Sequence, residues 1–269
     1  MKIISWEELS SGRGFGLRVA AAIGVFDGLH IGHQELVQRV RGREGLASAI
    51  VTFARNPKLI LSPSTFHGVL STLDQKLSLI DSLGVDLCVL IDFSGDFSKL
   101  PGRTFLSMLC GSGDVHFLAV GSDFHCGHRM DTDAQGIRQF CVERAIGVEL
   151  LKAVHWGSHP VSSSRIRKAI FEGRLEDARG MLGHAYAIDL RACETLVSGR
   201  LVPGGGQVNP PAGFYEADVV HSIEGTEGTT RVVADLGVDG SWAFPTSGTM
   251  GFQESALVDL SIIRRVSRE

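Results

Sequence analysis

The feature that most constrains the fold of this chain is a regular alternation of apolar and amphipathic segments between about residue 18 and residue 182. The apolar segments are short, which is typical of strands buried on both faces of a sheet. They cover residues 18–26, 46–53, 85–93, 115–120 and 148–154. The segments between and after them have the apolar spacing of helices. They cover residues 31–43, 73–83, 103–110, 133–145, 163–172 and 175–182. This alternation predicts an α/β domain with a parallel sheet and crossover helices.

The pattern changes after Gly183, where helical spacing ends and strand-like runs are separated by turns rich in glycine and proline. These runs cover residues 195–202, 214–223, 229–236 and 256–263. We therefore predict two domains: residues 1–185 with a Rossmann-like parallel sheet, and residues 186–269 with a small antiparallel β-barrel or sandwich. The run 204–206 is all glycine, but it lacks the Lys and Ser/Thr of a phosphate loop, so we predict a hairpin turn there.

Composition excludes several classes of protein. The formal net charge is −4, which gives no general attraction to nucleic acid or to an anionic membrane. The five cysteines are odd in number and lack C-x-x-C spacing, which favours a reducing cytoplasm over a disulfide framework. We see no apolar run near the ~18 residues of a membrane span and no signal peptide, so we expect a cytoplasmic protein without membrane or nucleic-acid partners. Protein partners stay open.

The most informative motif is the run 24–33, with the sequence GVFDGLHIGH. It places His30 and His33 between a predicted strand and a predicted helix, with Gly32 between them. Free backbone N–H groups and the helix dipole favour an anion at such a junction. In open α/β sheets, ligands bind beyond the carboxyl ends of the strands. The motif therefore predicts a site for a chain of phosphates.

Three further runs follow predicted strands or open a predicted helix. In the run 161–167, VSSSRIR, serine hydroxyls and a guanidinium suit a polyphosphate, although a capped helix with solvated arginines explains it too. The run 119–129, AVGSDFHCGHR, offers close backbone approach and an aspartate for a ribose or base edge; its spacing alone favours an ordinary loop. The run 52–57, TFARNP, could wall a flat ligand or simply end a strand. A zinc site at His125, Cys126 and His128 is not expected, because no second Cys or His cluster would complete it.

These four motifs, in this order, resemble the prokaryotic bifunctional riboflavin kinase/FAD synthetase family. The amino-terminal half of that family is an FMN adenylyltransferase of the nucleotidyltransferase superfamily. The family pattern GxFDGxHxGH matches residues 24–33, VGx[DN]F matches 120–124, and ISS[TS]xIR matches 161–167 with Val161 for isoleucine. Residues 172–183 resemble the two-helix segment that closes this half. The resemblance, which covers about residues 15–185, implies the reaction ATP + FMN → FAD + pyrophosphate. It also implies Mg²⁺ arriving with ATP rather than in a metal cage of the protein.

The resemblance implies roles for residues of these motifs. His30 and His33 would act on the ATP phosphates and the transition state, and Ser163 and Arg167 would complete the catalytic set. The nucleotide site would also include Val25, Phe26, Asp27, Gly28, Gly32, Gly121, Asp123, Ser162 and Ser164. The flavin site would include Phe53, Asn56, Pro57, Phe124 and Cys126.

The chain departs from the family pattern at several positions. Asn56 stands where the family usually has histidine, and Cys126 stands where it usually has an aromatic residue. Residues 211–217 resemble a strand of the family's kinase domain, but the run 204–210 before it lacks the P-T-A-N segment that holds metal and nucleotide. The later run Phe244-Pro245-Thr246-Ser247 has Pro and Thr in the wrong order to replace it. We therefore predict a truncated kinase-like domain without riboflavin kinase activity.

Two other functions stay open at this point. One is a different adenylyl- or cytidylyltransferase of the same superfamily, with another phosphate acceptor; the F-D-G prefix and the kinase-like tail favour flavin over it. The other is a non-catalytic flavin or nucleotide sensor. The complete set of His30, His33 and Arg167 argues against a sensor, because binding alone does not require a full transfer site.

Overall fold

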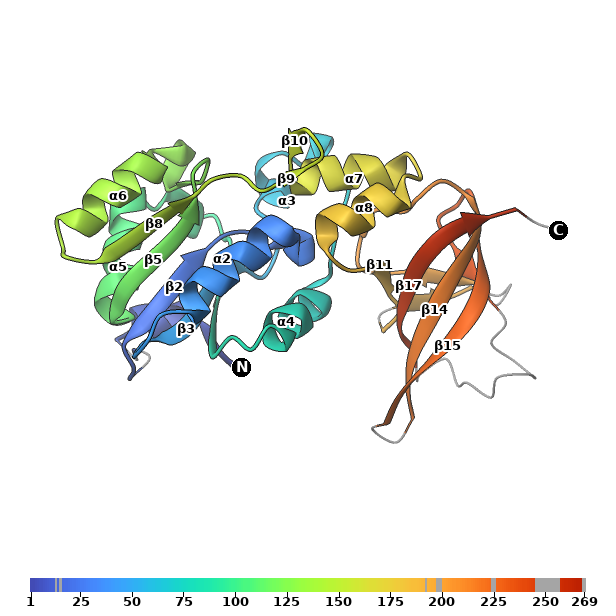
Figure 1. Cartoon of the computed structure of the whole chain (residues 1–269), viewed down its shortest axis with the longest axis horizontal. Coiled ribbons are helices and arrows are strands. Elements are labelled where there is room, and N and C mark those ends of the chain that lie inside the picture. Colours follow the sequence, from blue (N-terminus) through green and yellow to red (C-terminus); the bar gives the residue numbers. More distant parts are fainter. Residues whose placement is uncertain are drawn as a thin grey trace. The chain divides into compact units, whose positions relative to one another are not determined.

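A fully parallel sheet of six strands is the centre of the first of two units into which the chain divides (Figure 1). The computed structural model describes residues 1–12, 14, 16–191, 193–196, 200–223, 226–244 and 257–267. The first unit contains Met1–Phe66 and Lys76–Pro160, and the second contains His67–Gln75 and Val161–Glu269. These units are defined by spatial contacts, and their boundaries differ from the domain boundary predicted at residue 185. That boundary was placed where the sequence pattern changes, and it stays a prediction.

The order of the parallel strands is β1 (Lys2–Ser5), β4 (Leu87–Ile91), β3 (Ala47–Phe53), β2 (Val19–Ile23), β5 (Val115–Gly121) and β8 (Gly147–Leu151). The helices of this unit are α1 (Trp6–Ser10), α2 (Ile31–Arg41), α3 (Lys58–Leu61), α4 (Leu73–Ser82), which begins in the second unit, α5 (Gly102–Ser112) and α6 (Ala134–Val142). Short pairs of strands complete it: β6 (His125–Cys126) with β7 (Thr132–Asp133), and β9 (His155–Trp156) with β10 (His159–Pro160). Among the described residues, no helix is long and apolar enough to cross a membrane.

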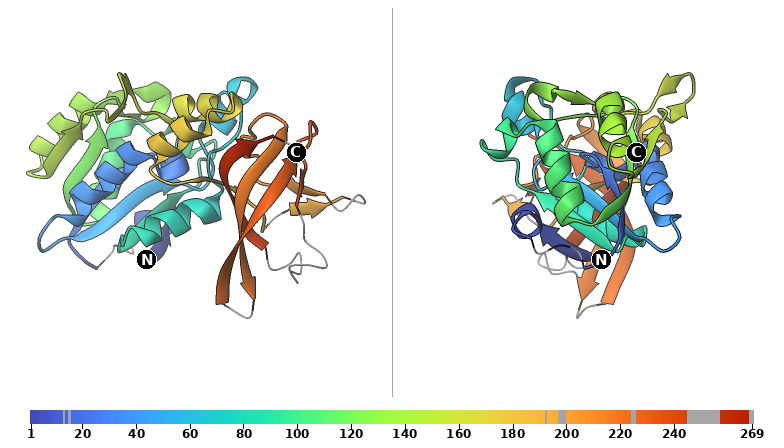
Figure 2. Two further views of the ribbon diagram at one scale, coloured as in Figure 1. Left: turned by 45° about the vertical axis from the view of Figure 1, so that its right-hand side comes forward. Right: turned by 90° about the vertical axis from the view of Figure 1, so that its left-hand side faces the viewer.

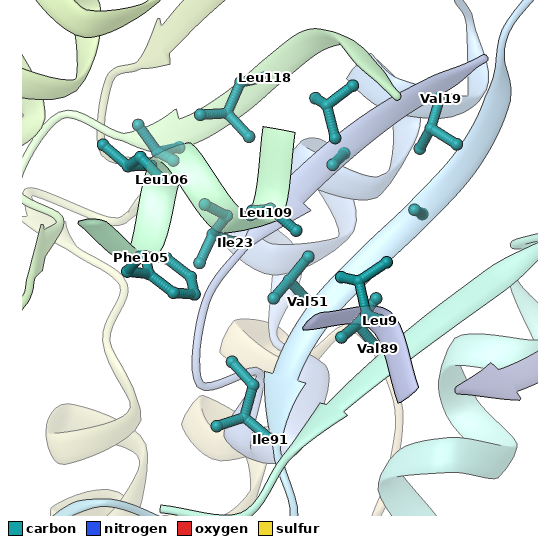
Figure 3. Packing of buried hydrophobic residues seen from close by; sticks show 14 of the residues in the cluster. Leu9, Val19, Ile23, Val51, Val89, Ile91, Phe105, Leu106, Leu109 and Leu118 are labelled. Atoms are coloured by element: carbon teal, nitrogen blue, oxygen red, sulfur yellow. The ribbon is translucent and has the colours of Figure 1, made fainter. Parts of the chain in front are cut away.

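Side chains of the central strands alternate between two hydrophobic layers, which is why these strands are apolar throughout their length. In β2, Ala21 and Ile23 pack in the layer formed with α1, α5 and α6. Figure 3 shows Ile23 in this layer together with side chains of α1 and α5. Ala20 and Ala22 pack in the opposite layer, formed with α2 and α4. All five residues of β2 are buried. Burial on both faces therefore holds the start of the H-x-G-H turn on a rigid strand.

The order of the strands reverses beside β2. From β2 the chain proceeds through β3 and β4 on one side, and through β5 and β8 on the other. In open α/β sheets, ligands bind outside the carboxyl ends of the strands at this reversal. The loops after β2 and β5 are the two that meet there.

The second unit contains a seven-stranded antiparallel sheet and helices α7 (Ser163–Phe171) and α8 (Leu175–Leu182). The order of its strands is β11 (Tyr186–Asp189), β17 (Leu257–Val266), β14 (Gly213–Ile223), β15 (Thr226–Leu236), β16 (Trp242–Ala243), β13 (Leu201–Pro203) and β12 (Cys193–Thr195). The long strands β14, β15 and β17 are strongly twisted (Figure 2). The sheet forms a nearly closed barrel, so the predicted parallel α/β domain followed by a small antiparallel β-domain is confirmed.

The predicted helices and strands of the α/β region are confirmed, mostly with shorter ends. Three expectations are wrong. The strand 18–26 ends at Ile23, because Phe26 adopts a left-handed conformation. The strand 195–202 is a hairpin of β12 and β13, and the glycine run 204–206 is a turn but joins β13 to β14, which do not pair with each other. Strands β1, β11 and β16 and helix α1 were not predicted, since they are short. Residues 245–247 and Ala256 lie outside the described residues.

Candidate active site

The turn from β2 to α2 contains an unusual run of left-handed backbone conformations. The φ angle is 52° at Phe26, 75° at Gly28 and 41° at Leu29. Only glycine adopts this conformation without strain; for other residues it costs roughly 1–3 kcal/mol each. Burial offsets this cost, because Phe26 and Leu29 are almost completely buried. The turn is therefore held in a strained shape by the core beneath it, as is common at functional sites.

His30 caps the first turn of α2. Its Nδ1 accepts a hydrogen bond of 3.3 Å from the backbone N–H of His33, and its backbone carbonyl accepts from the N–H groups of His33 and Gln34. Since an amide N–H can only donate, Nδ1 must be unprotonated, and the proton of the neutral ring is on Nε2. The cap thus makes His30 Nε2 a hydrogen-bond donor. The sequence motif gave no indication of this role.

His33 lies against His30 in a parallel stack, with 3.6 Å between the ring centroids and 12° between the planes. Phe26 packs on His33 with its centroid 5.0 Å away. Burial lowers the pKa of His30 from 6.5 to about 4. Burial, the neighbouring His30 and the Lys76 ammonium together hold the pKa of His33 well below its usual value. Both rings are therefore neutral at pH 7 before a ligand binds.

Gly32 leaves room for this histidine pair. A Cβ atom at Gly32 would lie 3.3 Å from Cε1 and Nδ1 of His30, which is tighter than an ordinary contact. Any side chain there would press on the capping ring. The glycine of H-x-G-H therefore keeps the His30 ring in place, in addition to the predicted shaping of the nucleotide turn.

A buried polar chain lies behind the turn. Asp27 is 4 % exposed and accepts a hydrogen bond of 3.2 Å from Nδ2 of Asn56. Oδ1 of Asn56 accepts from the backbone N–H of Lys58. The ammonium of Lys76, 5 % exposed, donates to the carbonyl of Phe53, and its charge interacts with the Asp27 carboxylate. Asn56, where the family usually has histidine, thus connects the ends of β2 and β3 through Asp27.

Lys76 is a site residue that the sequence reasoning missed. Burial lowers its pKa, and the Asp27 carboxylate opposes that shift. Its influence on His33 shows that it belongs to the surroundings of the histidine pair. A signal was present, because Lys76 lies at helical spacing between Leu73 and Ile80, on the apolar face of α4, where a lysine must find a buried partner.

The loop after β5 meets the histidine turn, as the strand order requires. The Asp123 carboxylate is exposed, and its charge raises the pKa of His30 against the larger effect of burial. A Cβ atom at Gly121 would lie 2.9 Å from Oδ1 of Asp123, so the glycine lets that side chain fold back. The structure thus brings together Asp27, Asp123 and the two histidines.

The predicted flavin-binding residues lie at the ends of β3 and β5. Phe53 and Pro57 are half-buried, and Asn56 is 8 % exposed, with its amide engaged as described above. Phe124 and Cys126 pack against the same hydrophobic layer as Phe53. Burial raises the pKa of the Cys126 thiol to about 12, so it is a neutral packing group. Phe53 also packs edge-on against Phe93 and Phe97, which the sequence analysis did not single out.

The serine–arginine run lies in the second unit, at the start of α7. Ser162 is the N-cap, and its side chain accepts a hydrogen bond of 3.2 Å from the backbone N–H of Arg165. Ser163 begins the helix, and Ser164 is exposed. Arg167 is 9 % exposed, and its Nε donates a hydrogen bond of 2.7 Å to the carbonyl of Gly68. The predicted helix cap is confirmed, and the arginine is held rather than solvated.

Comparison with known proteins agrees with this arrangement. The family model described as FAD synthetase matches residues 17–165. A bifunctional riboflavin kinase/FMN adenylyltransferase from Escherichia coli is 30% identical over 209 residues, 74% of this chain and 67% of the relative. A protein of the same description from Listeria monocytogenes is 30% identical over 61% of this chain and 54% of its own length. The chain thus spans between about half and two thirds of these relatives.

In two further similarities the match covers more of the other protein's length. An FAD synthetase from Listeria monocytogenes is 25% identical over 73% of this chain and 79% of its own length. A crystal structure described as a macrolide-efflux protein from Streptococcus pneumoniae has a TM-score of 0.81 and covers 100% of this chain and 92% of its own; at 20% identity it shows the fold alone. The matched region of the family model contains the turn, the two histidines and the loop after β5. The chain therefore belongs to the FAD synthetase family.

Proposed function

We propose that this protein is an FMN adenylyltransferase, which transfers AMP from ATP to FMN and releases pyrophosphate. The observation that carries the proposal is the stacked pair of neutral histidines at the start of α2, beside the reversal of strand order. Their position at a helix N-terminus suits an anion, and Nε2 of His30 is a donor. A binding protein would not need two histidines whose charge is suppressed by burial.

In this reaction a phosphate oxygen of FMN attacks the α-phosphorus of ATP in line. The new bond to FMN forms as the bond between the α-phosphorus and the bridging oxygen to the β-phosphorus breaks, and pyrophosphate leaves with that oxygen. No covalent intermediate with the protein is needed, so positioning and charge stabilisation provide the catalysis. His30 and His33 donate to the phosphate oxygens on which negative charge grows. As neutral donors, they avoid the cost of burying two adjacent cations.

Pyrophosphate departure requires fixed positive charge. We assign this role to Arg167, with the hydroxyls of Ser162, Ser163 and Ser164 as further donors. Asp123 would accept from the adenosine, and Phe53, Pro57 and Phe124 would border the flavin ring. Mg²⁺ would enter as part of Mg·ATP. Within the described residues, no cluster of three or more His, Cys, Asp or Glu side chains is arranged to hold a metal.

We further propose that riboflavin kinase activity is absent. The run 204–210 lacks the P-T-A-N segment. In the structure this loop pairs with another part of the same chain, since Gly206 O accepts from Val69 N at 3.0 Å and Val69 O accepts from Val208 N at 3.1 Å. A loop that is occupied in this way is unsuited to wrapping a second nucleotide.

The test is chromatography of products after incubation of the purified chain with Mg·ATP and either FMN or riboflavin. We expect FAD from FMN and no product from riboflavin. His30→Ala should lower the rate of FAD formation by roughly 10²–10³, whereas His155→Ala, an exposed histidine of β9, should have no effect. Turnover of another phosphate acceptor without FAD would favour a different transferase. ATP binding without any turnover, unchanged in His30→Ala, would favour a sensor.

A further inference from the structure

The segment His67–Gln75 leaves the first unit, joins the second, and returns at Lys76. It pairs with the loop after β13 as a short parallel bridge between Val69 and Gln207. Two backbone hydrogen bonds, from Val69 N to Gly206 O and from Val208 N to Val69 O, form this bridge. Its close approach requires Gly68, whose φ is 99° and where a Cβ atom would lie 2.7 Å from Gly206 O.

Two glutamines fasten the segment to the β-sheet of the second unit. Nε2 of Gln207 donates to Ala187 O at 2.9 Å, to Oε1 of Gln75 at 3.0 Å and to Leu70 O at 3.3 Å, while its Oε1 accepts from Asp189 N. Gln75 is 6 % exposed, and its Nε2 donates to Oδ1 of Asp259 at 2.7 Å. The buried amide of Gln75 and the half-buried amide of Gln207 thus each use both donor and acceptor, as a stable polar network requires.

A carboxylate completes the fastening. Asp189 is 5 % exposed and accepts a hydrogen bond from the Thr72 hydroxyl. It also accepts two hydrogen bonds, of 2.8 and 2.7 Å, from the guanidinium of Arg191. Arg191 in turn holds the pKa of Asp189 below its usual value, although burial opposes this. The segment 67–75 is therefore held through Thr72, Gln75 and the bridge at Val69.

The same segment orients Arg167. The carbonyl of Gly68, directly before the bridge, accepts the 2.7 Å hydrogen bond from Arg167 Nε. A guanidinium is planar, so fixing Nε fixes the direction in which the whole fork presents its other N–H groups. A free arginine side chain samples many rotamers, so restricting it in advance lowers the entropic cost of binding an anion.

We propose that the C-terminal β-sheet serves adenylyl transfer as a brace, in which Gln75, Gln207 and Asp189 hold the segment 67–75 so that the Gly68 carbonyl orients Arg167. This inference rests on the proposed function for the role of Arg167. It gives the kinase-like domain a positioning task in place of catalysis. Gln207 acts only through Arg167 and is a positioning residue.

A double-mutant cycle tests the brace. Arg167→Ala should lower kcat/KM for Mg·ATP by roughly 10²–10³, and Gln207→Leu, which keeps the size but removes the amide, by roughly 10- to 100-fold. In the double variant the Gln207 change should add less than about twofold, because its target is gone. The KM for FMN should not change in Gln207→Leu. Tyr215→Phe is the matched control, since it removes one partly buried hydrogen bond of the same unit, to Pro211 O, without touching the segment.

Hydrogen exchange separates the brace from the proposed function. In Gln207→Leu the amide of Val69 should lose at least about tenfold of its protection, and in Tyr215→Phe it should lose none. Unchanged protection in Gln207→Leu overturns the brace whether or not the protein makes FAD. If the losses in kcat/KM of Arg167→Ala and Gln207→Leu multiply in the double variant, the link between Gln207 and Arg167 is overturned. If the wild-type chain makes no FAD, the proposed function fails. The double-mutant cycle is then measured as affinity for inorganic pyrophosphate. The link to Arg167 holds if the Gln207 change adds little once Arg167 is removed, and it is overturned if the two losses multiply.

Discussion

Replacing His30 by asparagine separates its role as a helix cap from its role as a buried titratable group. Asparagine is among the best N-cap residues, so the first turn of α2 keeps an acceptor for the His33 N–H. The imidazole and its proton equilibrium are removed. The informative quantity is therefore how the free energy of unfolding changes with pH. Packing that the variant loses at every pH shifts this free energy by a constant amount and does not alter its pH dependence.

The magnitude follows from the pKa of His30. In the folded protein it is about 4, and in the unfolded chain it is near 6.5. Because the folded state resists the proton, the contribution of His30 to stability is present above pH 6.5 and is lost as the pH falls through 4. At ~1.36 kcal/mol for each pH unit, the wild-type protein should lose about 3 kcal/mol between pH 7 and pH 4 from this group. His30→Asn should not lose it, and the pKa of His33 should rise towards its usual value in that variant.

The assay is hydrogen exchange at the amides of Ala21 and Ala22 in β2, which reports the stability of the first unit alone. Opening free energies at pH 7, 6, 5 and 4 are compared between wild type and variant. The two curves should diverge below pH 6.5, with the variant less sensitive to acid. Parallel curves would refute the reasoning, because they would show that His30 titrates near its usual pKa and is not held neutral by burial.

Two other predictions concern the surroundings of the histidines. Lys76→Met should raise the pKa of His33, measured by NMR titration of the imidazole. It should also lower the free energy of unfolding by roughly 3–5 kcal/mol, since the Asp27 carboxylate stays buried and loses the Lys76 cation. Lys99→Met, at an exposed position, should do neither, and an unshifted pKa of His33 in Lys76→Met would contradict the assignment. Gly28→Ala should destabilise the protein by roughly 1–2 kcal/mol in thermal unfolding and should slow FAD formation, because the φ of Gly28 is 75°. Gly95→Ala should be neutral, since Gly95 has open space around it and an ordinary φ. Equal effects of the two substitutions would argue against strain at the turn.

Much of the architecture could be predicted because it depends on local patterns. The alternation of apolar runs with amphipathic helices is a direct record of strands buried on both faces, and α8 was predicted with the observed bounds. The turn residues were also found, because H-x-G-H follows a buried strand. Short elements such as β1 and β16 carry too few residues for a periodic signal. The hairpin 193–203 was missed, although the Ser-Gly dipeptide at 198–199 is a turn signal in the sequence.

The sequence by itself determined the fold class, the position of His30, Gly32 and His33 at the start of one helix and that of Arg167 within another, because these follow from residue type and spacing along the chain. Tertiary structure alone decided that both imidazoles are neutral, that the proton of His30 is on Nε2, and that Lys76 lies behind them, since burial and charge depend on which strands and helices meet. It also decided that Gly68 holds Arg167, a contact between residues 99 positions apart in the sequence. Local spacing cannot specify such contacts, because their partners come together only when the chain is packed.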